Sequence, residues 1–390
     1  MFKHIKSVVS VIAVAFLVYI FTFYIDGEMG VILLAFVLFA PLASLFFALY
    51  AQKRVKVTFD CDAYVQKGSY LDVEVTVRKT GAFPLAILEI CPYASEVFVR
   101  NVKKRRLTMF NEEKTTFTFR LDAAIGGNGE VGIYAVYSCG FLGFMRFPMK
   151  AKLPAAASVG VIPQLPDIKA SSQLFRSIAD TVLTSDEEEE NDTSMLFSAN
   201  TSPGYEHREY EHGDPLKRIN WKLSSKKAKL MVRLDEAVAS VQPVIVLDLF
   251  RRSSVSAENA VRGEEQLIRA VFGLLFLLVK QGIACNFVYR DASGKSVMES
   301  VDNPDYPNQL LLKILSIRVI PDKRVDLSEV GSSVCACVIA TTDAGAGFAA
   351  VADQLENKDN VSIIGLSVAS ANSTSLPLWY LDEENNFRLV

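Results

Sequence analysis

The 390-residue sequence predicts a multidomain membrane protein with a two-helix transmembrane hairpin, a β-sandwich and an α/β domain with a mostly parallel sheet. Three observations predict this organisation. Two long apolar runs occupy the first fifty residues, alternating apolar and charged residues follow from Val55, and short apolar strands alternate with helical patterns from about Gln242. The chain exceeds the roughly 100 to 150 residues that usually form one domain, so we expect two soluble domains beside the membrane segment.

Residues 1–54 are predicted to form the membrane hairpin, with spans over about residues 7–25 and 30–50. Each run approaches the roughly 20 residues that a helix needs to cross the hydrocarbon layer, and a cleaved signal peptide would lack the second run. Basic residues flank the outer ends and acidic residues occupy the turn, so the positive-inside rule places both termini and the soluble domains in the cytoplasm. We therefore expect a multi-pass protein of the plasma membrane, with a buried hairpin of a soluble domain as the alternative.

Cysteine usage agrees with a cytoplasmic location. The six cysteines show no CxxC pair and no nearby histidine at zinc-site spacing, so we interpret them as reduced core residues. They are Cys61, Cys91, Cys139, Cys285, Cys335 and Cys337. The formal net charge of -3 does not indicate a particular class of partner.

Residues 55–155 are predicted to form a β-sandwich of immunoglobulin-like type. The segments LDVEVTVRKTG, TTFTFRLDA and VGIYAVYSCG alternate apolar with polar residues, which is the period of a strand with one buried face. Strands of this length and spacing are typical of a small sandwich. The basic run KKRR at 103–106 is expected to coat a solvated edge or loop, with binding of phosphate or lipid headgroups as the alternative.

Residues 156–241 are predicted to connect the two soluble domains. Within them, SDEEEENDTS at 185–194 is expected to be a flexible acidic loop, because it contains no large apolar residue and cannot bury enough surface to become ordered. A divalent-cation site in this run is the alternative, although neighbouring carboxylates without a turn scaffold repel one another.

Residues 242–390 are predicted to form the α/β domain. PVIVLDLF has the apolar run of a strand buried on both faces, and ACNFVYR, VCACVIATT and VSIIGLS supply further strands. Residues 264–282 predict a helix that begins with two glutamates and ends before Gly282, while YPNQLLLKILS and GFAAVADQLEN show helical patterns. Strands and helices that alternate in this way predict a layered domain with a mostly parallel sheet.

Residues 204–233, GYEHREYEHGDPLKRINWKLSSKKAKLMVR, concentrate charged and aromatic side chains in one stretch. This block resembles the signature of a bacterial and archaeal family, domain of unknown function 58, and the upstream segments CGFLGFMRF and VGVIP resemble further parts of that family. Two positions depart from the family pattern, since Ala228 replaces a glycine and Lys226 replaces an arginine. The matching residues to which we assign a structural or partner-binding role are Arg208, Glu209, Tyr210, Gly213, Asp214, Arg218, Trp221, Lys222, Ser224 and Arg233.

The resemblance implies further properties of the chain. Family members typically carry a C-terminal domain similar to the von Willebrand factor A domain, and their genes tend to neighbour those of MoxR-type AAA+ ATPases and transglutaminase-like membrane proteins. The resemblance therefore implies a membrane-anchored assembly or chaperone-like protein that acts with a cytosolic MoxR-type AAA+ ATPase. It implies a transglutaminase-like membrane protein as a further partner.

The residues of the signature leave more than one role open. Asp214 followed by a proline predicts a helix start, and LMVRLDE predicts a strand with Leu230, Val232 and Leu234 on one face. We expect a brace of ion pairs, anchored by the tryptophan, that joins the two soluble domains. The alternative is an exposed surface whose basic side chains bind a carboxylate, a phosphate or an anionic lipid.

The sequence predicts a protein that is not an enzyme. His207 and His212 are five positions apart, which places them on neither one helix face nor one strand face, and no serine or cysteine nucleophile lies near them. Nucleic-acid binding is disfavoured as well, because glutamates intersperse the basic residues of the signature.

A metal site of the von Willebrand type would need a DxSxS loop after the first strand of the α/β domain, with a threonine and an aspartate from later loops. Asp248 is present, but Phe250 and Arg252 occupy both serine positions, so we expect no cofactor. The alternative is that the protein is a metal-dependent ligand binder or enzyme. In that case Asp248, Thr342 and Asp343 are the candidate ligands for Mg²⁺. Without a metal, Asp248 is expected to pair with one of the two arginines at 251 and 252 or to cap a neighbouring turn.

The sequence thus favours a non-enzymatic, membrane-tethered scaffold that presents the loops of its α/β domain to a cytosolic protein partner. It lacks a recognisable nucleophile, general base or intact metal constellation. The alternatives are the metal-dependent protein described above and a protein that binds anionic lipid or phosphate through the basic signature.

Overall fold

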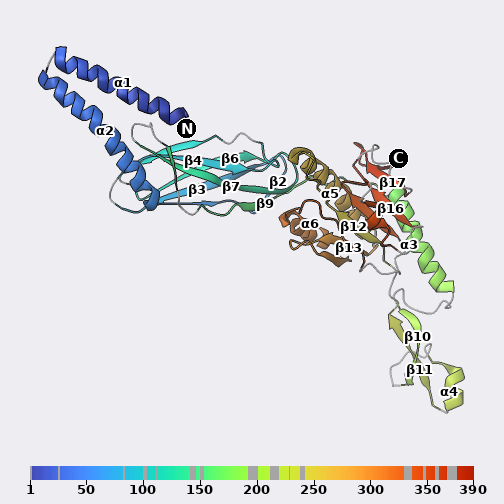
Figure 1. Cartoon of the computed structure of the whole chain (residues 1–390). Helices are drawn as coiled ribbons and strands as arrows, with labels where there is room; N and C mark the ends of the chain where they lie inside the picture. Colours follow the sequence, from blue (N-terminus) through green and yellow to red (C-terminus); the bar gives the residue numbers. More distant parts are fainter. Residues whose placement is uncertain are drawn as a thin grey trace. The chain divides into compact units, whose positions relative to one another are not determined.

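The computed structural model describes residues 2–24, 27–81, 84–99, 103–110, 112–140, 146–149, 153–191, 201–210, 219–227, 229–237, 242–328, 336–345, 348–355, 360–366 and 376–390. The chain divides into two compact units. One unit contains Met1–Gln164 and Ala257–Arg262, and the other contains Leu165–Ser256 and Gly263–Val390. Figure 1 shows the helices and strands of both units along the chain.

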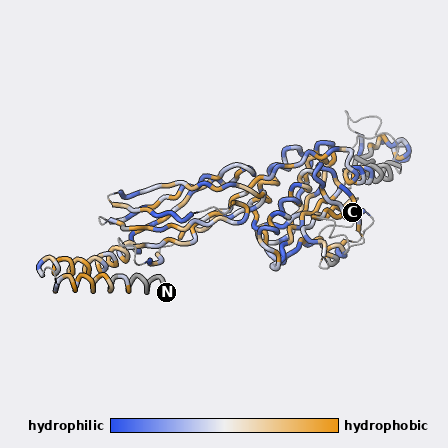
Figure 2. The backbone as a smooth tube through the Cα atoms, turned by 90° about the horizontal axis from the view of Figure 1, so that it is seen from above, coloured by the Kyte–Doolittle hydropathy of each residue, from blue (hydrophilic) through white to orange (hydrophobic). Residues whose placement is uncertain are grey.

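The N-terminal segment forms two helices that contact each other, α1 (Phe2–Tyr24) and α2 (Gly27–Arg54). They approach closely at Gly30, where an added Cβ atom would lie 2.5 Å from the Cα atom of Thr22. Among the described residues, one helix is long and apolar enough to cross a membrane, the stretch Gly27–Gln52 of α2. The apolar part of α1 is shorter, so the two-span hairpin stays a prediction. Figure 2 shows the hydrophobic residues of these helices in orange.

The first unit also contains two β-sheets with an apolar core between them. Buried and exposed residues alternate along β3, which confirms the predicted period of two. The three-stranded sheet has the order β1 (Val55–Asp60), β3 (Tyr70–Lys79) and β6 (Lys114–Asp122). The other sheet has the order β2 (Tyr64–Gln66), β9 (Ala157–Ile162), β7 (Gly127–Cys139), β4 (Leu85–Ala94) and β5 (Arg105–Met109), with β8 (Arg146–Pro148) also paired to β7.

Core residues from both sheets pack against each other. Val75 and Val77 of β3 and Leu88 and Ile90 of β4 are all 0% exposed and belong to one cluster. Each such side chain contributes about 1.5 to 3 kcal/mol of apolar burial, which stabilises the packing of the two sheets. The basic run at 103–106 leads into β5, an edge strand, and its side chains are exposed, as expected for a solvated edge.

The second unit is built on a seven-stranded mixed sheet with the order β14-β13-β12-β15-β16-β17-β18. Parallel partners flank β12 on both sides and every residue of β12 is buried, as predicted for a strand covered on both faces. The pairs from β13 to β17 are parallel, and each edge strand is antiparallel to its neighbour. The strands are β12 (Val244–Asp248), β13 (Cys285–Arg290), β14 (Ser296–Val301), β15 (Cys337–Thr341), β16 (Val361–Ile364), β17 (Leu378–Leu381) and β18 (Phe387–Leu389).

The predicted helices of this region are present with shifted ends. α5 (Ala257–Lys280) begins before the predicted start at residue 264, and Gly282 adopts a φ of 80° just beyond its end, which suits a glycine that stops a helix. α6 (Tyr306–Ser316) coincides with YPNQLLLKILS. α7 (Ala349–Ala352) is shorter than the predicted helix, part of which lies outside the described residues.

The connector contains a long helix where the sequence predicted a loop. α3 (Gln173–Asn191) continues through most of the acidic run, so the flexible loop predicted over 185–194 is wrong as far as Asn191, and residues 192–194 lie outside the described residues. Glutamate has a good helix propensity, so a run of glutamates extends a helix that the buried Leu174 and Ile178 have anchored. Local propensity therefore outweighed the lack of apolar residues.

Candidate functional site

The signature stretch folds as an antiparallel β-hairpin that contains a short helix. β10 (Thr201–Glu209) pairs with β11 (Met231–Ala237), and α4 (Trp221–Lys227) lies between them in the chain. The predicted strand over LMVRLDE is confirmed, but Leu230 is 43% exposed whereas Val232 is buried, so these two residues do not share a buried face.

Hydrogen bonds from small polar residues hold α4 against the hairpin. Asn220 Oδ1 accepts the Leu223 N–H at 3.1 Å and thereby caps the first turn of α4. The Asn220 side-chain nitrogen lies 2.9 Å from His207 Nε2 on β10. The buried Ser224 hydroxyl oxygen accepts the Met231 N–H at 2.8 Å. Ser224 and His207 therefore have structural contacts, and Asn220 is a structural residue that the sequence pattern did not single out.

Among the described charged and aromatic residues of the signature, Glu209, Trp221 and several lysines are exposed, whereas Arg208 and Tyr210 are partly buried. Glu209 forms an ion pair with Lys229 at 2.6 Å, with both side chains about two-thirds exposed, and Arg208 Nη1 donates to the Glu209 carbonyl oxygen at 3.2 Å. Trp221 is 65% exposed and Lys222 is exposed as well, so the anchoring role of the tryptophan stays a prediction. An exposed ion pair of this kind contributes about 0 to 1 kcal/mol, too little for a rigid brace.

Several signature residues cannot be placed. Gly213, Asp214, Arg218 and His212 lie within 211–218, outside the described residues. Arg233 pairs through its backbone with His207, and Tyr210 donates its N–H to the Leu230 carbonyl oxygen at 2.8 Å. The role of the signature as a link between the soluble domains stays a prediction.

A second candidate site lies at the carboxyl edge of the seven-stranded sheet. Asp248 ends β12 and is paired in register with Thr341, which ends β15. The chain leaves β12 for β13 on one side of the strand and later reaches β15 on the other side, so the two strand ends form a topological switch point. Open α/β sheets bind their ligands at such points.

Asp248 is 0% exposed, and its carboxylate accepts hydrogen bonds from several polar groups. Its Oδ1 accepts the Val325 N–H at 3.1 Å, and its Oδ2 accepts the Thr341 hydroxyl at 3.0 Å. The guanidinium of Arg324 completes the set, with Nη1 at 2.8 Å from Asp248 Oδ2. Burial raises the pKa of Asp248, while the adjacent Arg324 charge and these hydrogen bonds act in the opposite direction.

Arg324 fills the centre of this group. Its Nη1 also lies 3.4 Å from Thr341 Oγ1, and its Nη2 lies 3.0 Å from the Asp343 carbonyl oxygen and 3.5 Å from Asp343 Oδ2. The Phe250 ring stacks on the guanidinium with its centroid 4.0 Å from Cζ. The Arg324 side chain is only 13% exposed. The guanidinium is therefore enclosed by carboxylate, hydroxyl and carbonyl oxygen atoms on one side and by an aromatic ring.

These residues do not fit a divalent cation. Mg²⁺ needs about six oxygen ligands at roughly 2.1 Å, whereas the oxygen atoms of Asp248, Thr341 and Asp343 already accept N–H groups of Arg324. No group of three or more His, Cys, Asp or Glu side chains among the described residues is arranged to hold a metal. The positive charge that a metal would supply at this edge of the sheet is carried by the protein itself.

The structure changes which residues form the site. Thr342, the predicted ligand, donates its hydroxyl to the Phe250 carbonyl oxygen, and the neighbouring Thr341 contacts Asp248 instead. Arg324 stands 76 positions from Asp248 in the sequence, so no local motif connects the two.

The arginines that follow β12 also have partners other than the predicted one. Arg251 forms a bidentate pair with Glu264 on α5, with N–O distances of 2.8 and 2.7 Å. Arg252 Nε donates to Asp343 Oδ2 at 2.6 Å. The predicted pairing of Asp248 with either arginine is therefore wrong, because Arg324 already satisfies that carboxylate.

Further contacts tie the loops of this edge to one another. The Ser253 hydroxyl donates to Asp322 Oδ2, and the Asp322 N–H donates to the Arg251 carbonyl oxygen at 2.9 Å. Asp322 adopts a φ of 55°, in the left-handed region that non-glycine residues rarely occupy. The loop after β12, the segment before residue 328 and the loop after β15 are therefore joined by hydrogen bonds of both side chains and backbone.

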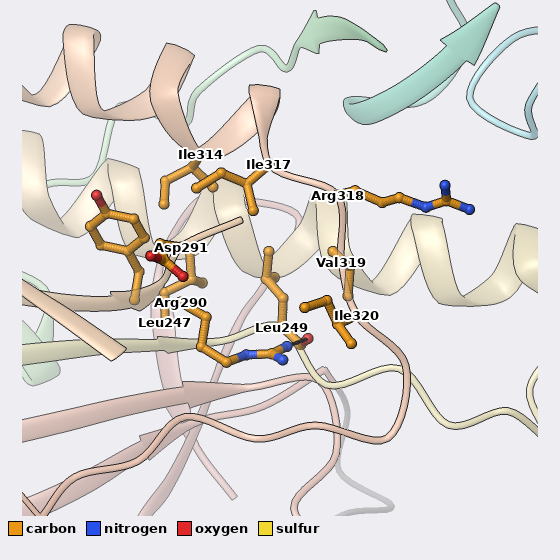
Figure 3. A pocket seen from close by; sticks show the side chains of 10 residues that line it. Leu247, Leu249, Arg290, Asp291, Ile314, Ile317, Arg318, Val319 and Ile320 are labelled. Carbon is orange, nitrogen blue, oxygen red and sulfur yellow. Dashed lines mark hydrogen bonds between the residues drawn. The ribbon is translucent and has the colours of Figure 1, made fainter. Parts of the chain in front are cut away.

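A small pocket lies beside β12 and β13, and its walls are mainly apolar. Figure 3 shows aliphatic side chains gathered around Leu249, with the Arg318 side chain extending away from them. Arg290 Nη2 donates to the Leu249 carbonyl oxygen at 2.9 Å, and burial lowers the pKa of Arg290. The carboxylate of Asp291 accepts hydrogen bonds within its own turn. The residues that line the pocket are Leu247, Leu249, Tyr289, Arg290, Asp291, Ile314, Ile317, Arg318, Val319 and Ile320.

Comparison with protein families gives one match. The family described as protein of unknown function DUF58 matches residues 206–327, which include the signature from Glu206 onward, Asp248 and Arg324. This match confirms the resemblance inferred from the signature. Among curated proteins, none matches the chain.

Solved structures share only a distant similarity with part of the chain. The CARDB domain of a Pyrococcus furiosus protein is 14% identical, and the match covers 28% of this chain and 94% of that domain at a TM-score of 0.22. A cohesin module from Clostridium perfringens is 13% identical, with coverage of 28% and 98% and a TM-score of 0.23. An Escherichia coli alpha-2-macroglobulin is 16% identical, with coverage of 29% and 17% and a TM-score of 0.24. Scores this low support no conclusion about function.

Proposed function

Because residues 206–327 match the family described as protein of unknown function DUF58, we propose that this protein is a non-enzymatic, membrane-anchored scaffold. Its α/β unit presents the carboxyl-edge loops of the sheet to a cytosolic protein partner. The partner that the family resemblance suggests is a MoxR-type AAA+ ATPase, with a transglutaminase-like membrane protein as a further candidate. The α2 helix, with its apolar stretch Gly27–Gln52, supports the anchor.

The observation that carries the proposal is the position of Arg324. In a metal-dependent domain of the von Willebrand factor A type, a cation is bound at the carboxyl edge of the sheet. A group of the protein partner completes the coordination of that cation. Here the guanidinium of Arg324 satisfies Asp248, Thr341 and the Asp343 carbonyl group from within the chain. The loops are consequently formed before any ligand arrives, which favours recognition of a folded protein surface without a metal.

The relation of the α/β unit to the von Willebrand factor A domain is part of the proposal. Its support is the mixed sheet with five parallel strands and the acidic residue at the end of its first strand. The buried state of Asp248 also argues against acid–base catalysis, because a substrate has no direct access to a carboxylate that is 0% exposed.

Crosslinking of the full chain in its native membrane tests the proposal. We expect capture of an AAA+ ATPase or another protein partner, with the same yield in buffer that contains excess EDTA as in buffer that contains Mg²⁺. Capture that disappears in EDTA and returns with Mg²⁺ would instead establish the metal-dependent reading, and the absence of any captured protein would overturn the scaffold.

A variant separates surface recognition from folding. Arg252→Gln removes the half-exposed guanidinium that pairs with Asp343 but leaves Arg324 in place. If the carboxyl-edge loops form the interface, this variant reduces crosslinking yield without lowering the melting temperature by more than a few degrees. Arg262→Gln, which removes an exposed pair with Glu258 on α5, is the matched control and should leave the yield unchanged.

A further inference from the structure

We propose that the end of the β-sandwich next to α2 rests on the membrane surface and binds anionic lipid headgroups through a basic cluster, Lys104, Arg106 and Arg146. This inference rests on the anchoring part of the proposed function. It concerns a different surface from the signature and from the carboxyl-edge loops, and it assigns a ligand to residues of the sandwich.

The junction between α2 and the sandwich has no linker. α2 ends at Arg54 and β1 begins at Val55. On α2, Ser44, Ala48 and Ala51 are buried at a spacing that places them on one helix face, and α2 packs against β4, β7 and β8. The sandwich therefore moves with α2 as one body.

One glycine shows how close the helix and the sandwich are. An added Cβ atom at Gly140, the residue after β7, would lie 2.8 Å from the Ser44 carbonyl oxygen. The two backbones are in direct contact at this point, which leaves no room for a flexible hinge.

Helix geometry sets the height of the sandwich end above the bilayer. A helix that enters the hydrocarbon layer at Gly27 leaves it after about 20 residues, near Phe46. The remaining turns up to Arg54 span roughly 12 Å at 1.5 Å per residue. The buried face of α2 extends from Ser44 to Ala51, on both sides of this exit point, so the sandwich end lies near the headgroup layer, which is roughly 5 to 8 Å thick on each side.

The basic cluster lies beside this junction. Arg146 of β8 is paired with Cys139 of β7, and the next residue after Cys139 is Gly140, which touches α2. Glu89 of β4 is paired with both Tyr137 and Arg106, about two residues farther along the strands. Two residues of strand correspond to roughly 7 Å, so the cluster is within reach of the same headgroup layer.

The charges of the cluster are not balanced. A single carboxylate, Glu89, is 4% exposed and receives all three cations: Arg106 Nη2 at 3.1 Å, Lys104 Nζ at 3.9 Å and Arg146 Nη2 at hydrogen-bond distance. Arg146 is held in place by the Tyr137 ring, whose centroid lies 3.6 Å from its Cζ. Lys104 and Arg106 are 56% and 72% exposed. Their excess positive charge faces solvent on an ordered platform, as recognition of phosphate groups requires.

The other described charges at this end do not cancel the excess. Glu112 and Glu113 are exposed on the turn before β6, but Lys114 follows them directly and Arg54 and Lys56 are exposed at the junction itself. Each Lys or Arg near an anionic surface strengthens attachment by about 1 kcal/mol, which is roughly fivefold in the docking equilibrium. Neutralising two of the three cluster cations should therefore weaken docking by about 25-fold.

Hydrogen exchange of the full chain in lipid nanodiscs tests this proposal. We expect slower amide exchange in β5, an edge strand, when the discs contain phosphatidylglycerol than when they contain phosphatidylcholine alone, with an effect of about fivefold or more. High salt should abolish the difference, since salt screens such contacts. The double variant Lys104→Gln/Arg106→Gln should abolish it as well, while Arg146 continues to compensate Glu89.

The matched control changes two cations at the other end of the sandwich. Lys67 lies in the turn before β3, and Arg120 pairs with the exposed Asp72, so Lys67→Gln/Arg120→Gln removes the same charge far from α2. This control should keep the lipid-dependent protection. Melting temperatures of both double variants show whether the sandwich stays folded.

The other possible outcomes each contradict either the lipid contact, the identity of the ligand or the membrane anchor. Equal exchange in neutral and anionic discs, or protection that survives in Lys104→Gln/Arg106→Gln, would refute the lipid contact while leaving the scaffold intact. Protection in neutral discs on addition of inorganic phosphate would identify a free anion as the ligand instead of a lipid. A chain that does not co-purify with discs at all would overturn the membrane anchor itself.

Discussion

Arg324 shows how a single residue changes the chemistry of a site. An aspartate at the end of the first parallel strand suggests a metal ligand, yet its partner is a guanidinium that is 13% exposed and stacked on Phe250. Two buried opposite charges are costly to desolvate, so such a pair persists when further hydrogen bonds satisfy both groups. Here Thr341 and the Val325 N–H supply them.

Replacement of Arg324 by methionine should destabilise the protein by about 3 to 5 kcal/mol, because it leaves the Asp248 carboxylate buried without a counter-charge. Denaturant unfolding measures the loss. The double variant Asp248→Asn/Arg324→Met should recover part of it, since no buried charge remains unpaired. Equal destabilisation of the single and double variants would show that the pair is not coupled.

Glu299 is expected to make stability depend on pH. Burial alone would raise the pKa of Glu299, but hydrogen bonds from Lys313, Tyr306 and Tyr289 outweigh burial and lower it. The tyrosine hydroxyls lie 2.6 and 2.7 Å from the carboxylate. A lowered pKa in the folded state means that the stabilisation is present above the unfolded value of 4.5 and is lost as pH falls through the lower folded value.

Glu299→Gln should therefore cost about 1 to 2 kcal/mol at neutral pH and progressively less below pH 4.5. Thermal unfolding of the variant and the natural protein across this pH range measures the difference. Glu258→Gln removes an exposed carboxylate and serves as the control. A gap that stays constant down to acidic pH would contradict the assignment.

The cysteines provide a residue-level test of the core. Burial raises the pKa of Cys285 and of Cys337 to about 12, and Cys91 and Cys139 are buried as well, whereas Cys61 is half-buried. Iodoacetamide labelling of the folded chain near pH 8, followed by mass mapping, should modify Cys61 before these four, because only a thiolate reacts. Rapid labelling of Cys285 would show that its strand opens.

At the scale of elements, polar side-chain contacts link α4 to the hairpin of the signature. Asn220 caps α4 and also reaches His207 on β10. Among the residues of the hairpin whose burial is described, Ile219, Met231 and Val232 are the buried apolar ones. An element with few buried contacts opens locally at a small fraction of the global free energy of unfolding.

Asn220→Ala should accordingly cost about 1 kcal/mol of local stability. Hydrogen exchange should become faster in β10, α4 and β11 while the exchange of β12 stays unchanged. Ser225→Ala, an exposed position of α4, is the control. Faster exchange in β12 as well would indicate that the hairpin is energetically part of the sheet unit.

The same scale explains which elements could be predicted. Strands with one buried face and the helix α6 were recognised correctly, because side-chain periodicity arises between near neighbours. The acidic run was mispredicted because low hydrophobicity was given more weight than the helix propensity of glutamate. The 65% exposure of Trp221 could not be predicted from the sequence, because only the packed fold shows the environment of a side chain.

For the whole molecule, the topology of the anchor is open to direct test. Two spans place the N-terminus and the soluble units on the same side of the membrane, whereas a single span through α2 places them on opposite sides. Protease digestion of inverted membrane vesicles that carry the chain with a tag at each end should remove both tags. Protection of the N-terminal tag alone would establish one span and would contradict the hairpin.

The sequence by itself determined the apolar N-terminal segment, the alternating strands of the sandwich, the buried strands of the α/β unit and the family match. Each of these depends on patterns within one or two dozen residues, where periodicity and turn chemistry act locally. Only the tertiary structure decided that Arg324 pairs with Asp248 and that three cations surround Glu89. The partners in each group come from different strands and loops, and 76 positions separate Asp248 from Arg324. No local motif connects residues so far apart in the sequence. Their charges meet because the fold places the strands and loops that carry them side by side.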